Sequence, residues 1–442
     1  MGSVNLDNTG SGSAITLSSD GTSLLLNGSA IGGGGGGDPA LYKDNASSAT
    51  TPVASGTNAL ALGNTAVASG ENAFAIGSDT DATGLNSLAL GKGAQAVSTR
   101  CIAIGLNASA QADRSIAIGN NGNVANATYA TAIGSGSVGS GSEAHGSGSV
   151  ALSNARAGGS DSFAAVIGNN TTTYGATATH SVAFSYLAKA SGNYAFAQGY
   201  EAQALGNGDV ALGSYTQTNG GVGLGYKGRA TGLRSFGVNN NTNGGATANY
   251  ATAIGDGCLA SGTSSVAIGS GCTADALGAV AIGRTTNVNG IRKFVYSATT
   301  VSGNYDGSSQ TGIQVLSAAT TDATATALAA HGTASTDNQV ILPNNSAYSF
   351  SGTIIARESA TNGSDYASWE IKGALLRDAN AASTVLGNGI QNKLYATSGA
   401  SAWAIALTAD TTNGGLKIEV TGAASTNIRW VATVNTSEVT YA

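Results

Sequence analysis

The sequence has little charge, little aromatic content and no long apolar run. Only 10% of its 442 residues are charged and 6% are aromatic, and its 18 Lys and Arg are spread without a cluster. A net charge of −6 without a basic cluster argues against nucleic acid as a partner. Because no stretch of 18 apolar residues occurs, we expect no insertion into a membrane.

Proline and cysteine are equally scarce, with three residues of each beside 66 glycines. So much glycine with so little proline excludes a collagen helix and a Pro-Gly-rich disordered tract, so the glycines are expected to serve turns. Three cysteines without a CxxC pair cannot form a full disulfide framework. The fold must therefore be held together by other means.

What the sequence has is a repeat. The phrase ALALG ends at Gly63, and its relatives AFAIG, SLALG, CIAIG and SIAIG each end 14 residues after the one before. Sixteen copies extend to Gly283, and a second phrase such as AVASG, ending at Gly70, lies between them. Both phrases alternate with a period of two and stop at a turn residue, so each unit predicts two short strands that form one turn of a coil.

Such a turn has room inside only for small side chains. Ala59 and Ala61 of the first strand, with Ala66 and Ala68 of the second, form the small face that we expect inside. The bulky face must then point outward, where water would make it a large apolar patch, so we predict that other copies cover it in a homotrimer of about 128 kDa, three times 42.8 kDa. The predicted trimer-interface residues are Leu60, Leu62, Phe74, Ile76, Leu88, Leu90, Ile102, Ile104, Val266, Ile268, Val280 and Ile282.

The repeat is similar to that of a known family. SVAIG at 265–269, then CTADALG, then AVAIG at 279–283 resemble the head repeat of YadA-type trimeric autotransporter adhesins, over residues 57–290. The resemblance implies a left-handed parallel β-roll wound by three chains, and the same repeat occurs in fibres of tailed bacteriophages. An autotransporter would also need a secretion signal and a C-terminal membrane segment, and neither is found here, which favours the phage fibre.

The flanking segments carry two further resemblances. Residues 1–37, with DGTSLLLNG and the run Gly32 to Gly37, resemble the opening segment of virion proteins from phages of cyanobacteria. This implies a virion-attachment segment, joined by a flexible glycine linker and a lead-in at 38–56 to the roll. Residues 339–442 resemble the C-terminal domain of phage tail fibres.

A different domain is predicted for residues 291–442. The 14-residue period stops after Arg284, and alternating runs such as YASWEIKGALLR and GLKIEVTG are separated by turn-rich segments, which is typical of an antiparallel β-sandwich. All three tryptophans lie here and share strand faces with Ile, Leu or Val, so they are predicted core residues. The candidate receptor contacts are loop residues: Tyr305, Asp306, Asn344, Asn345, Asn362, Asp365 and Tyr366.

No motif predicts catalysis, a cofactor or a metal. The three histidines are isolated, although His145 or His180 could meet its copies around a trimer axis as a metal ligand. No Walker A motif occurs, and no pair of carboxylates has a spacing that indicates a glycosidase, so we expect no enzyme. Cys258 and Cys272 should stack on successive turns, either as small buried residues, which we favour, or as a disulfide.

Together these observations predict a trimeric phage tail fibre that attaches the virion to a host-surface receptor. Its N-terminus would dock on a virion tail or capsid protein, and its C-terminal domain would bind a host-surface glycan or protein, strengthened by threefold valency. We expect it to be made in the host cytoplasm and to reside in the virion. The alternatives are a capsid decoration or structural fibre without a receptor, an autotransporter-type adhesin passenger, or a polysaccharide depolymerase.

Overall fold

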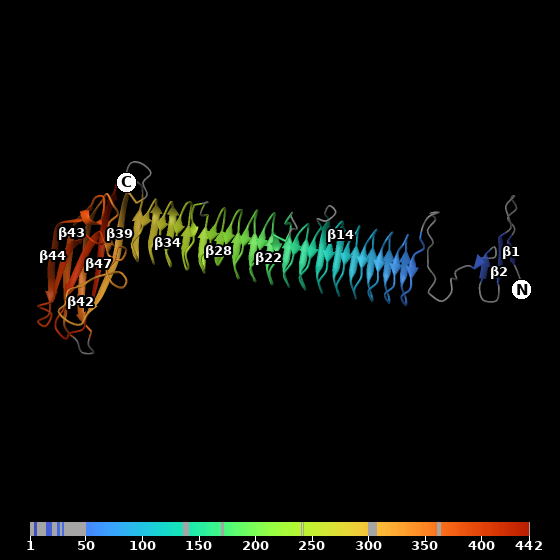
Figure 1. Ribbon diagram of the computed structural model, residues 1–442, viewed down its shortest axis with the longest axis horizontal. Coiled ribbons are helices and arrows are strands. Elements are labelled where there is room, and N and C mark those ends of the chain that lie inside the picture. The colour runs from blue at the N-terminus through green and yellow to red at the C-terminus, as the bar shows by residue number, and fades with distance from the viewer. Residues whose placement is uncertain are drawn as a thin grey trace. The chain divides into compact units, whose positions relative to one another are not determined.

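The computed structural model describes residues 50–441, except 136–140, 169–171, 240, 242, 299–306 and 360–363, together with four short strands before residue 31. The chain divides into two compact units, residues 1–194 and 195–442, each of which is described by itself. Figure 1 shows the strands of the roll stacked side by side along each unit.

The first unit contains nine turns of a parallel β-solenoid. The first strand of each turn pairs in parallel with the first strand of the next, so Leu60 lies beside Phe74, and Ala61 beside Ala75. These strands are β6 (Leu60–Leu62), β8 (Phe74–Ile76), β10 (Leu88–Leu90), β12 (Ile102–Ile104), β14 (Ile116–Asn120), β16 (Thr131–Ser135), β18 (Val150–Leu152), β20 (Phe163–Ala165) and β22 (Val182–Phe184).

The second strands of these turns form their own parallel ladder. They are β5 (Val53–Ala54), β7 (Val67–Ala68), β9 (Asp81–Ala82), β11 (Gln95–Ala96), β13 (Ser109–Ala110), β15 (Val124–Ala125), β17 (Glu143–Ala144), β19 (Arg156–Ala157), β21 (Gly175–Ala176) and β23 (Lys189–Ala190). Before them, β1 (Val4–Leu6), β2 (Ile15–Ser19), β3 (Leu24–Leu26) and β4 (Ser29–Ala30) form an antiparallel sheet in chain order. The glycine run 32–37 and residues 38–49 lie outside the described residues.

The second unit continues the same architecture for eight first strands. These are β24 (Phe196–Gln198), β26 (Val210–Leu212), β28 (Gly221–Leu224), β30 (Ser235–Val238), β32 (Thr252–Ile254), β34 (Val266–Ser270), β36 (Val280–Arg284) and β38 (Lys293–Ser297). The second strands are β25 (Gln203–Ala204), β27 (Gln217–Thr218), β29 (Arg229–Ala230), β31 (Gly245–Ala246), β33 (Leu259–Ala260), β35 (Thr273–Ala274) and β37 (Asn287–Val288).

The inside of the roll is lined by small side chains, as the repeat predicts. Ala61, Ala66 and Ala68 are each at most 2% exposed. The exception among the four predicted inward residues is Ala59, which is half-buried, while its equivalent one turn later, Ala73, is buried. The prediction of a parallel solenoid with a thin, alanine-filled interior is therefore confirmed.

Close stacking of the turns explains the glycine that ends the first phrase. Gly105 has φ +120°, and a Cβ there would lie 2.0 Å from the carbonyl oxygen of Gly119 in the next turn. Other corner positions with positive φ are held by different residues, among them Asn72 and Asn86 with φ 53°. The Nδ2 of Asn72 donates to Oδ1 of Asn86 at 3.0 Å, so side chains as well as backbone tie the turns together.

The solenoid extends beyond residue 290, where the repeat predicts its end. Strand β38 pairs in parallel with β36, with Phe294 beside Val280 and Tyr296 beside Ile282. The sequence KFVYS has lost the alanine and glycine of the phrase but keeps its alternation, because Val295 is fully buried between two exposed aromatic residues. The last turn therefore belongs to the roll by register, although its composition has already changed.

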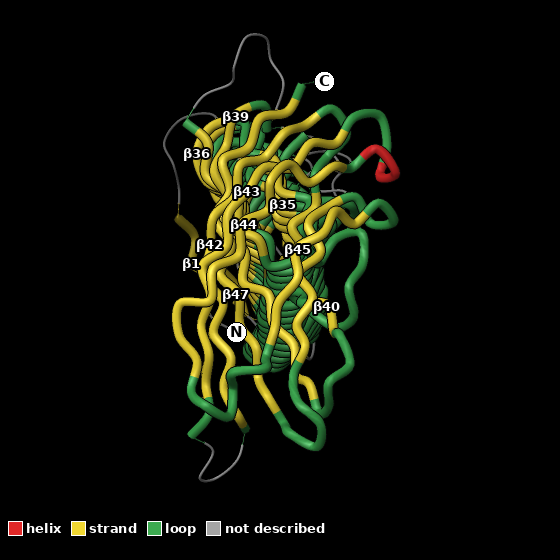
Figure 2. Tube along the Cα trace, turned by 90° about the vertical axis from the view of Figure 1, so that its left-hand side faces the viewer, coloured by secondary structure: helices red, strands yellow, loops and turns green. Residues whose placement is uncertain are grey.

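Two antiparallel sheets follow and form the predicted sandwich. The larger sheet has the order β38–β39–β47–β42–β43–β44, and in the smaller sheet β46 pairs with β45, β40 and β41. The elements are β39 (Ser309–Thr320), β40 (Thr326–Ala327), β41 (Val340–Ile341), β42 (Ser346–Glu358), β43 (Tyr366–Arg377), η1 (Ala381–Ser383), β44 (Val385–Ala396), β45 (Ala404–Asp410), β46 (Gly415–Thr421) and β47 (Ile428–Thr440). Figure 2 shows β42, β43, β44 and β47 on one side, with β40 and β45 on the other.

The core of the sandwich is built around the tryptophans. Trp369, Trp403 and Trp430 are each at most 2% exposed, and the ring centroids of Trp369 and Trp403 lie 5.6 and 5.9 Å from that of Trp430. The indole N–H of Trp430 donates to Thr320 Oγ1 at 3.0 Å. The prediction that these three tryptophans are core residues is confirmed.

Candidate functional site

The twelve predicted interface residues lie on the outward side of the first strands. Their register stacks them into two columns in each unit, since Leu88 lies beside Ile102 and Leu90 beside Ile104. Phe74 and Leu90 are exposed in the single chain, at 43% and 39%, and the other ten are half-buried. The columns thus form an apolar surface, and within one chain only the side chains of neighbouring turns shield it from water.

The outward side of the second strands has a different character. In the second unit its column contains Gln203, Gln217, Arg229, Thr273 and Asn287, which are half-buried or exposed, with Leu259 as an apolar exception. Polar side chains recur there because that side is compatible with water, whereas Val or Ile recurs on the first strands. The two outward sides of the roll are therefore chemically distinct.

The apolar outward side continues into the larger sheet of the sandwich. Phe294 on β38 lies beside Ile313 on β39, and both are exposed. Further along the same sheet, Val439, Ala347 and Leu376 lie side by side on β47, β42 and β43. Strict alternation along these three strands is the sequence signal that could have identified this surface.

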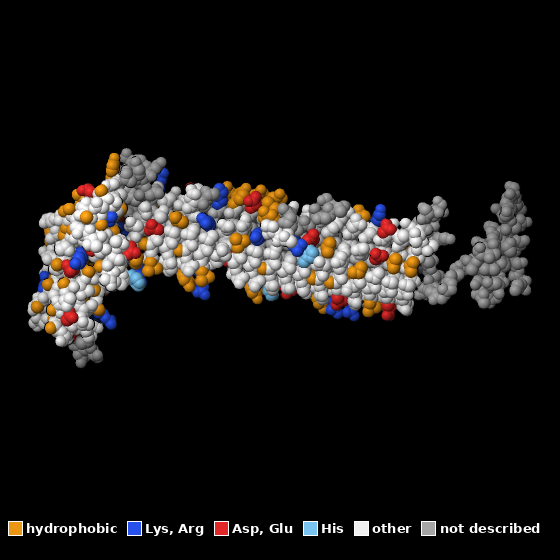
Figure 3. Space-filling model, viewed as in Figure 1, with side chains coloured by type: hydrophobic (Ala, Val, Ile, Leu, Met, Phe, Trp, Pro, Cys, Tyr) orange, Lys and Arg blue, Asp and Glu red, His pale blue; other side chains and the backbone are white. Residues whose placement is uncertain are grey.

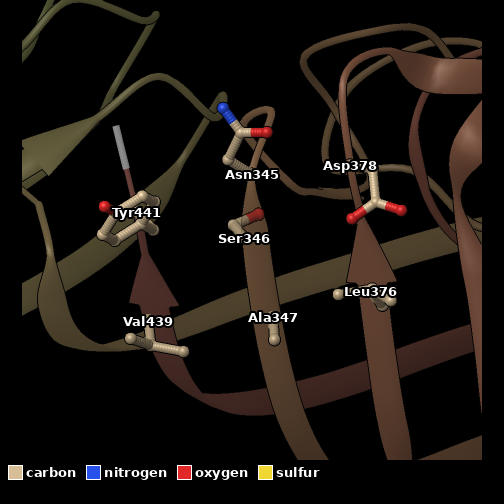
Figure 4. Close-up of a pocket in the computed structure, with 7 residues that line it drawn as sticks. All are labelled: Asn345, Ser346, Ala347, Leu376, Asp378, Val439 and Tyr441. Atoms are coloured by element: carbon tan, nitrogen blue, oxygen red, sulfur yellow. The ribbon is translucent and has the colours of Figure 1, made fainter.

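That row of side chains forms the floor of a cavity of about 350 Å³ at one end of the sandwich. Figure 4 shows its seven lining residues, with polar groups of Asn345 and Asp378 above the apolar row. The main chain closes this end, because Asn345 N donates to the carbonyl of Asp378 at 2.9 Å and Tyr441 N donates to that of Asn345 at 2.8 Å.

The structure brings only some of the candidate receptor contacts together. Asn345 lines the cavity just described, and its neighbour Asn344 lines a second one of about 250 Å³ with Gln310 and Tyr348. Asp365 and Tyr366 lie at the opposite end of the β42–β43 hairpin, where Arg357 pairs with Tyr366. Tyr305, Asp306 and Asn362 fall outside the described residues.

Asp365 and Tyr366 are held by local contacts at their end of the sandwich. Thr397 Oγ1 donates to Asp365 Oδ1 at 2.6 Å, and the ring of Tyr366 stacks on that of Tyr395 with 5.1 Å between centroids. A hydrogen bond to the Tyr395 hydroxyl raises the pKa of the exposed Tyr366. The seven candidates therefore do not form one site.

A buried polar cluster, which the sequence did not reveal, joins the last turn of the roll to the sandwich. Lys293 Nζ on β38 lies 2.5 Å from Glu438 Oε1 on β47, and their side chains are 5% and 0% exposed. Glu438 also accepts from Thr436 Oγ1 at 2.5 Å and from Gln310 Nε2 at 2.9 Å. Burial, together with the charge and hydrogen bond of Glu438, raises the pKa of Tyr348 well above its ordinary value.

The cysteines are buried free thiols within the described residues. Cys272 Sγ donates to the carbonyl of Gly283 at 3.1 Å. Cys258 and Cys272 are both fully buried in the interior of the roll, and the hydrogen bond to Cys272, together with burial, raises the pKa of Cys258. The interpretation as small buried residues accounts for them in this structure.

The histidines predicted as possible axial ligands make local contacts away from the apolar columns. His145 follows the second strand β17, and its Nε2 lies 2.9 Å from Glu143 Oε2. His180 lies at a corner, stacked on Tyr194 with 4.8 Å between centroids. Over the part of the chain that the structure describes, no three His, Cys, Asp or Glu side chains are grouped as a metal site would need. No described helix is long and apolar enough to cross a membrane.

Comparison with known proteins identifies the repeat but not the whole chain. Five segments match the family model of the YadA head domain repeat: 54–80, 82–100, 102–121, 190–216 and 260–286. No curated protein matches the sequence. Among solved structures, a tailspike protein from Acinetobacter baumannii bacteriophage Fri1, described as a capsular polysaccharide depolymerase, is similar at 10% identity and a TM-score of 0.24, over 86% of this chain and 67% of that one.

Proposed function

We propose that the chain is a homotrimeric attachment fibre of a bacteriophage particle. The roll serves as the shaft, and the sandwich carries the surface that meets the host. One observation carries the trimer: the outward side of the described first strands is mostly apolar and stacked in register, with exceptions such as Thr131 and Gln198, while the outward side of the second strands is mixed and more often polar.

The energetics favour covering these columns with identical chains. A half-buried Val, Ile or Leu gains on the order of 1 kcal/mol when its remaining surface leaves water. With about two such side chains at most turns of the roll, the contiguous exposed apolar area is larger than the surface of a soluble monomer usually carries. Identical straight columns match one another turn by turn, so a rotation axis parallel to the roll closes the assembly.

The attachment role is supported by the sequence at both ends and by the repeat. The matched segments are copies of the YadA head domain repeat, and residues 1–37 and 339–442 resemble phage virion segments. Three sandwiches on one fibre multiply weak contacts with a host-surface glycan or protein. An adhesin passenger shares the repeat, and a decoration fibre shares the shaft, so the location on the particle separates the three.

Antibody fragments against residues 291–442 test this proposal directly. Bound fragments should label fibres on intact particles in electron micrographs and reduce adsorption to host cells, while fragments against the roll should label without blocking. Labelling without any effect on adsorption would support a decoration fibre. No label on particles would contradict the virion location.

A pair of substitutions tests the trimer interface. Ile268→Asp places a charge on the apolar column and should prevent assembly, because three carboxylates would be buried close together. Thr273→Asp adds the same charge on the polar side of a neighbouring strand and should leave the trimer intact. Equal behaviour of the two variants in sedimentation would contradict the assignment of the faces.

A further inference from the structure

Three tyrosines occupy the same corner of three successive turns in the second unit. The ring centroids of Tyr200 and Tyr215 lie 5.2 Å apart, and those of Tyr215 and Tyr226 lie 5.9 Å apart. The residues are 40%, 44% and 58% exposed, in chain order. Aromatic rings this exposed offer apolar faces that gain from contact with a ligand.

A second track of planar polar groups runs beside the tyrosines. Gln203 on β25 lies beside Gln217 on β27, which lies beside Arg229 on β29. All three belong to the polar outward column of the second strands. Amide and guanidinium groups can both donate hydrogen bonds in a plane, which suits a ligand with many hydroxyl groups.

A hollow of about 250 Å³ lies between the two tracks, lined by Tyr215, Gln217, Lys227, Arg229 and Asn241. Lys227 Nζ lies 5.1 Å from the ring centroid of Tyr226. Figure 3 shows hydrophobic side chains gathered at the upper edge of the roll beside the part labelled β28 in Figure 1, with a cationic side chain next to them and an acidic one among them. The hollow thus combines an aromatic wall with two cations.

The tyrosine track is local, unlike the apolar columns. At most other turns the same corner carries polar residues such as Asn64, Lys92 and Asp256, with Tyr186 and Leu106 as exceptions, while an apolar side chain recurs on the outward side of each described first strand. A contact between chains of the fibre would need a feature that continues along the roll. Tyrosines that occur at only a few successive turns, next to a more polar side, fit a ligand other than a sister chain of the fibre.

We propose that this surface binds an anionic polysaccharide laid across successive turns. Sugar rings have apolar faces that pack on tyrosine, their hydroxyls suit Gln217, and uronate carboxylates suit Lys227 and Arg229. Successive turns are about 4.8 Å apart, which is of the order of one sugar ring, so a chain of sugars can meet the same pair of tracks repeatedly.

Charge favours a polysaccharide over a nucleic acid. Glu201 holds the corner position one turn before Tyr215, so the two cations do not form a basic groove, and the chain as a whole has a net charge of −6. Binding through a phosphate backbone needs several Lys or Arg contacts. The site is separate from the sandwich surface proposed for attachment and does not depend on it.

The experiment measures binding of the full chain to immobilised polygalacturonate, with its methyl-esterified form as a matched neutral polymer and oligo-dT as a nucleic acid probe. Wild type should bind polygalacturonate, more weakly as salt increases, and bind the other two probes at least about fivefold less tightly. Equal or tighter binding to the ester or to oligo-dT would overturn the proposal, as would no binding to polygalacturonate.

The test variants introduce residues that suit the backbone of the roll, and they should therefore keep the fold intact. Tyr215 has φ 59°, and asparagine holds the equivalent position at Asn107 with φ 55°, so Tyr215→Asn suits the backbone. We expect Tyr215→Asn and Arg229→Gln each to weaken binding roughly five- to tenfold. Tyr250→Asn, also at φ 59° but at the opposite corner, is the control and should bind as wild type. If Tyr215→Asn and Arg229→Gln match the control, the site is refuted.

Discussion

The buried pair Lys293–Glu438 gives the sharpest test of how the roll and the sandwich are joined in the second unit. Glu438→Gln removes one charge and leaves the Lys293 ammonium in a site where only 5% of its side chain is exposed. Breaking a buried ion pair by changing one partner costs about 3–5 kcal/mol, because the other charge stays buried without compensation. For a domain of this size we expect the unfolding midpoint to fall by roughly 6–20 °C.

Tryptophan fluorescence is the assay of choice, since Trp369, Trp403 and Trp430 are the only tryptophans and all are buried in the sandwich. The matched control is Glu370→Gln, which breaks the pair with Lys372 at 3.7 Å, whose side chains are 43% and 49% exposed. An exposed pair of this kind contributes about 0–1 kcal/mol, so the control should melt close to wild type.

Removing both charges should restore part of the loss. The double variant Lys293→Met, Glu438→Leu removes both buried charges of this pair, although Tyr348, Gln310 and Thr436 each lose a hydrogen-bond partner. We therefore expect its midpoint to lie between those of Glu438→Gln and wild type. If Glu438→Gln melts no lower than Glu370→Gln, the cluster does not hold this junction and the reasoning fails.

Three further predictions concern the interior. Because the pKa of Tyr348 is raised in the folded state, the stability that this residue contributes is fully present below about pH 10 and is lost as the pH rises through the folded-state pKa. In Tyr348→Phe, the melting temperature measured by fluorescence should therefore fall less steeply with alkaline pH than in wild type. Gly213→Ala, at φ +120°, places a Cβ 2.3 Å from the carbonyl oxygen of the next turn, whereas the Cβ of Gly208→Ala, at φ +72°, meets nothing within 4 Å. Melts followed by circular dichroism should show that the free energy of unfolding falls by about 2–5 kcal/mol in the first variant and by about 1–2 kcal/mol in the second. Equal losses in the two variants would contradict the close stacking of the turns. Cys258 and Cys272 should react with a maleimide about a hundredfold more slowly in the native than in the denatured protein, and fast native labelling would show that the roll opens there.

The regular part of the fold could be predicted because one constraint acts at every turn. Ala61 and Ala68 are small for the same reason in each repeat, so the inward face, the strand positions and the tryptophan core all followed from period and phase. Ala59 is the exception, since it is half-buried although Ala61 of the same turn is buried.

Features that depend on register between distant segments could not be predicted. Lys293 and Glu438 are 145 positions apart, and only the antiparallel pairing of β39 with β38 and β47 brings them together. The candidate receptor residues were chosen by composition, which cannot tell that Asn345 and Tyr366 lie at opposite ends of one hairpin. The tyrosine track was visible in the sequence only as single residues at unequal spacing.

In the proposed fibre, each chain leaves its bulky columns for two sister chains to cover. Sedimentation equilibrium of the purified full chain measures this most directly, because the mass does not depend on shape. We expect a single species of about 128 kDa, three times the chain mass of 42.8 kDa, across a wide range of concentration. A folded species that remains at 42.8 kDa would contradict it.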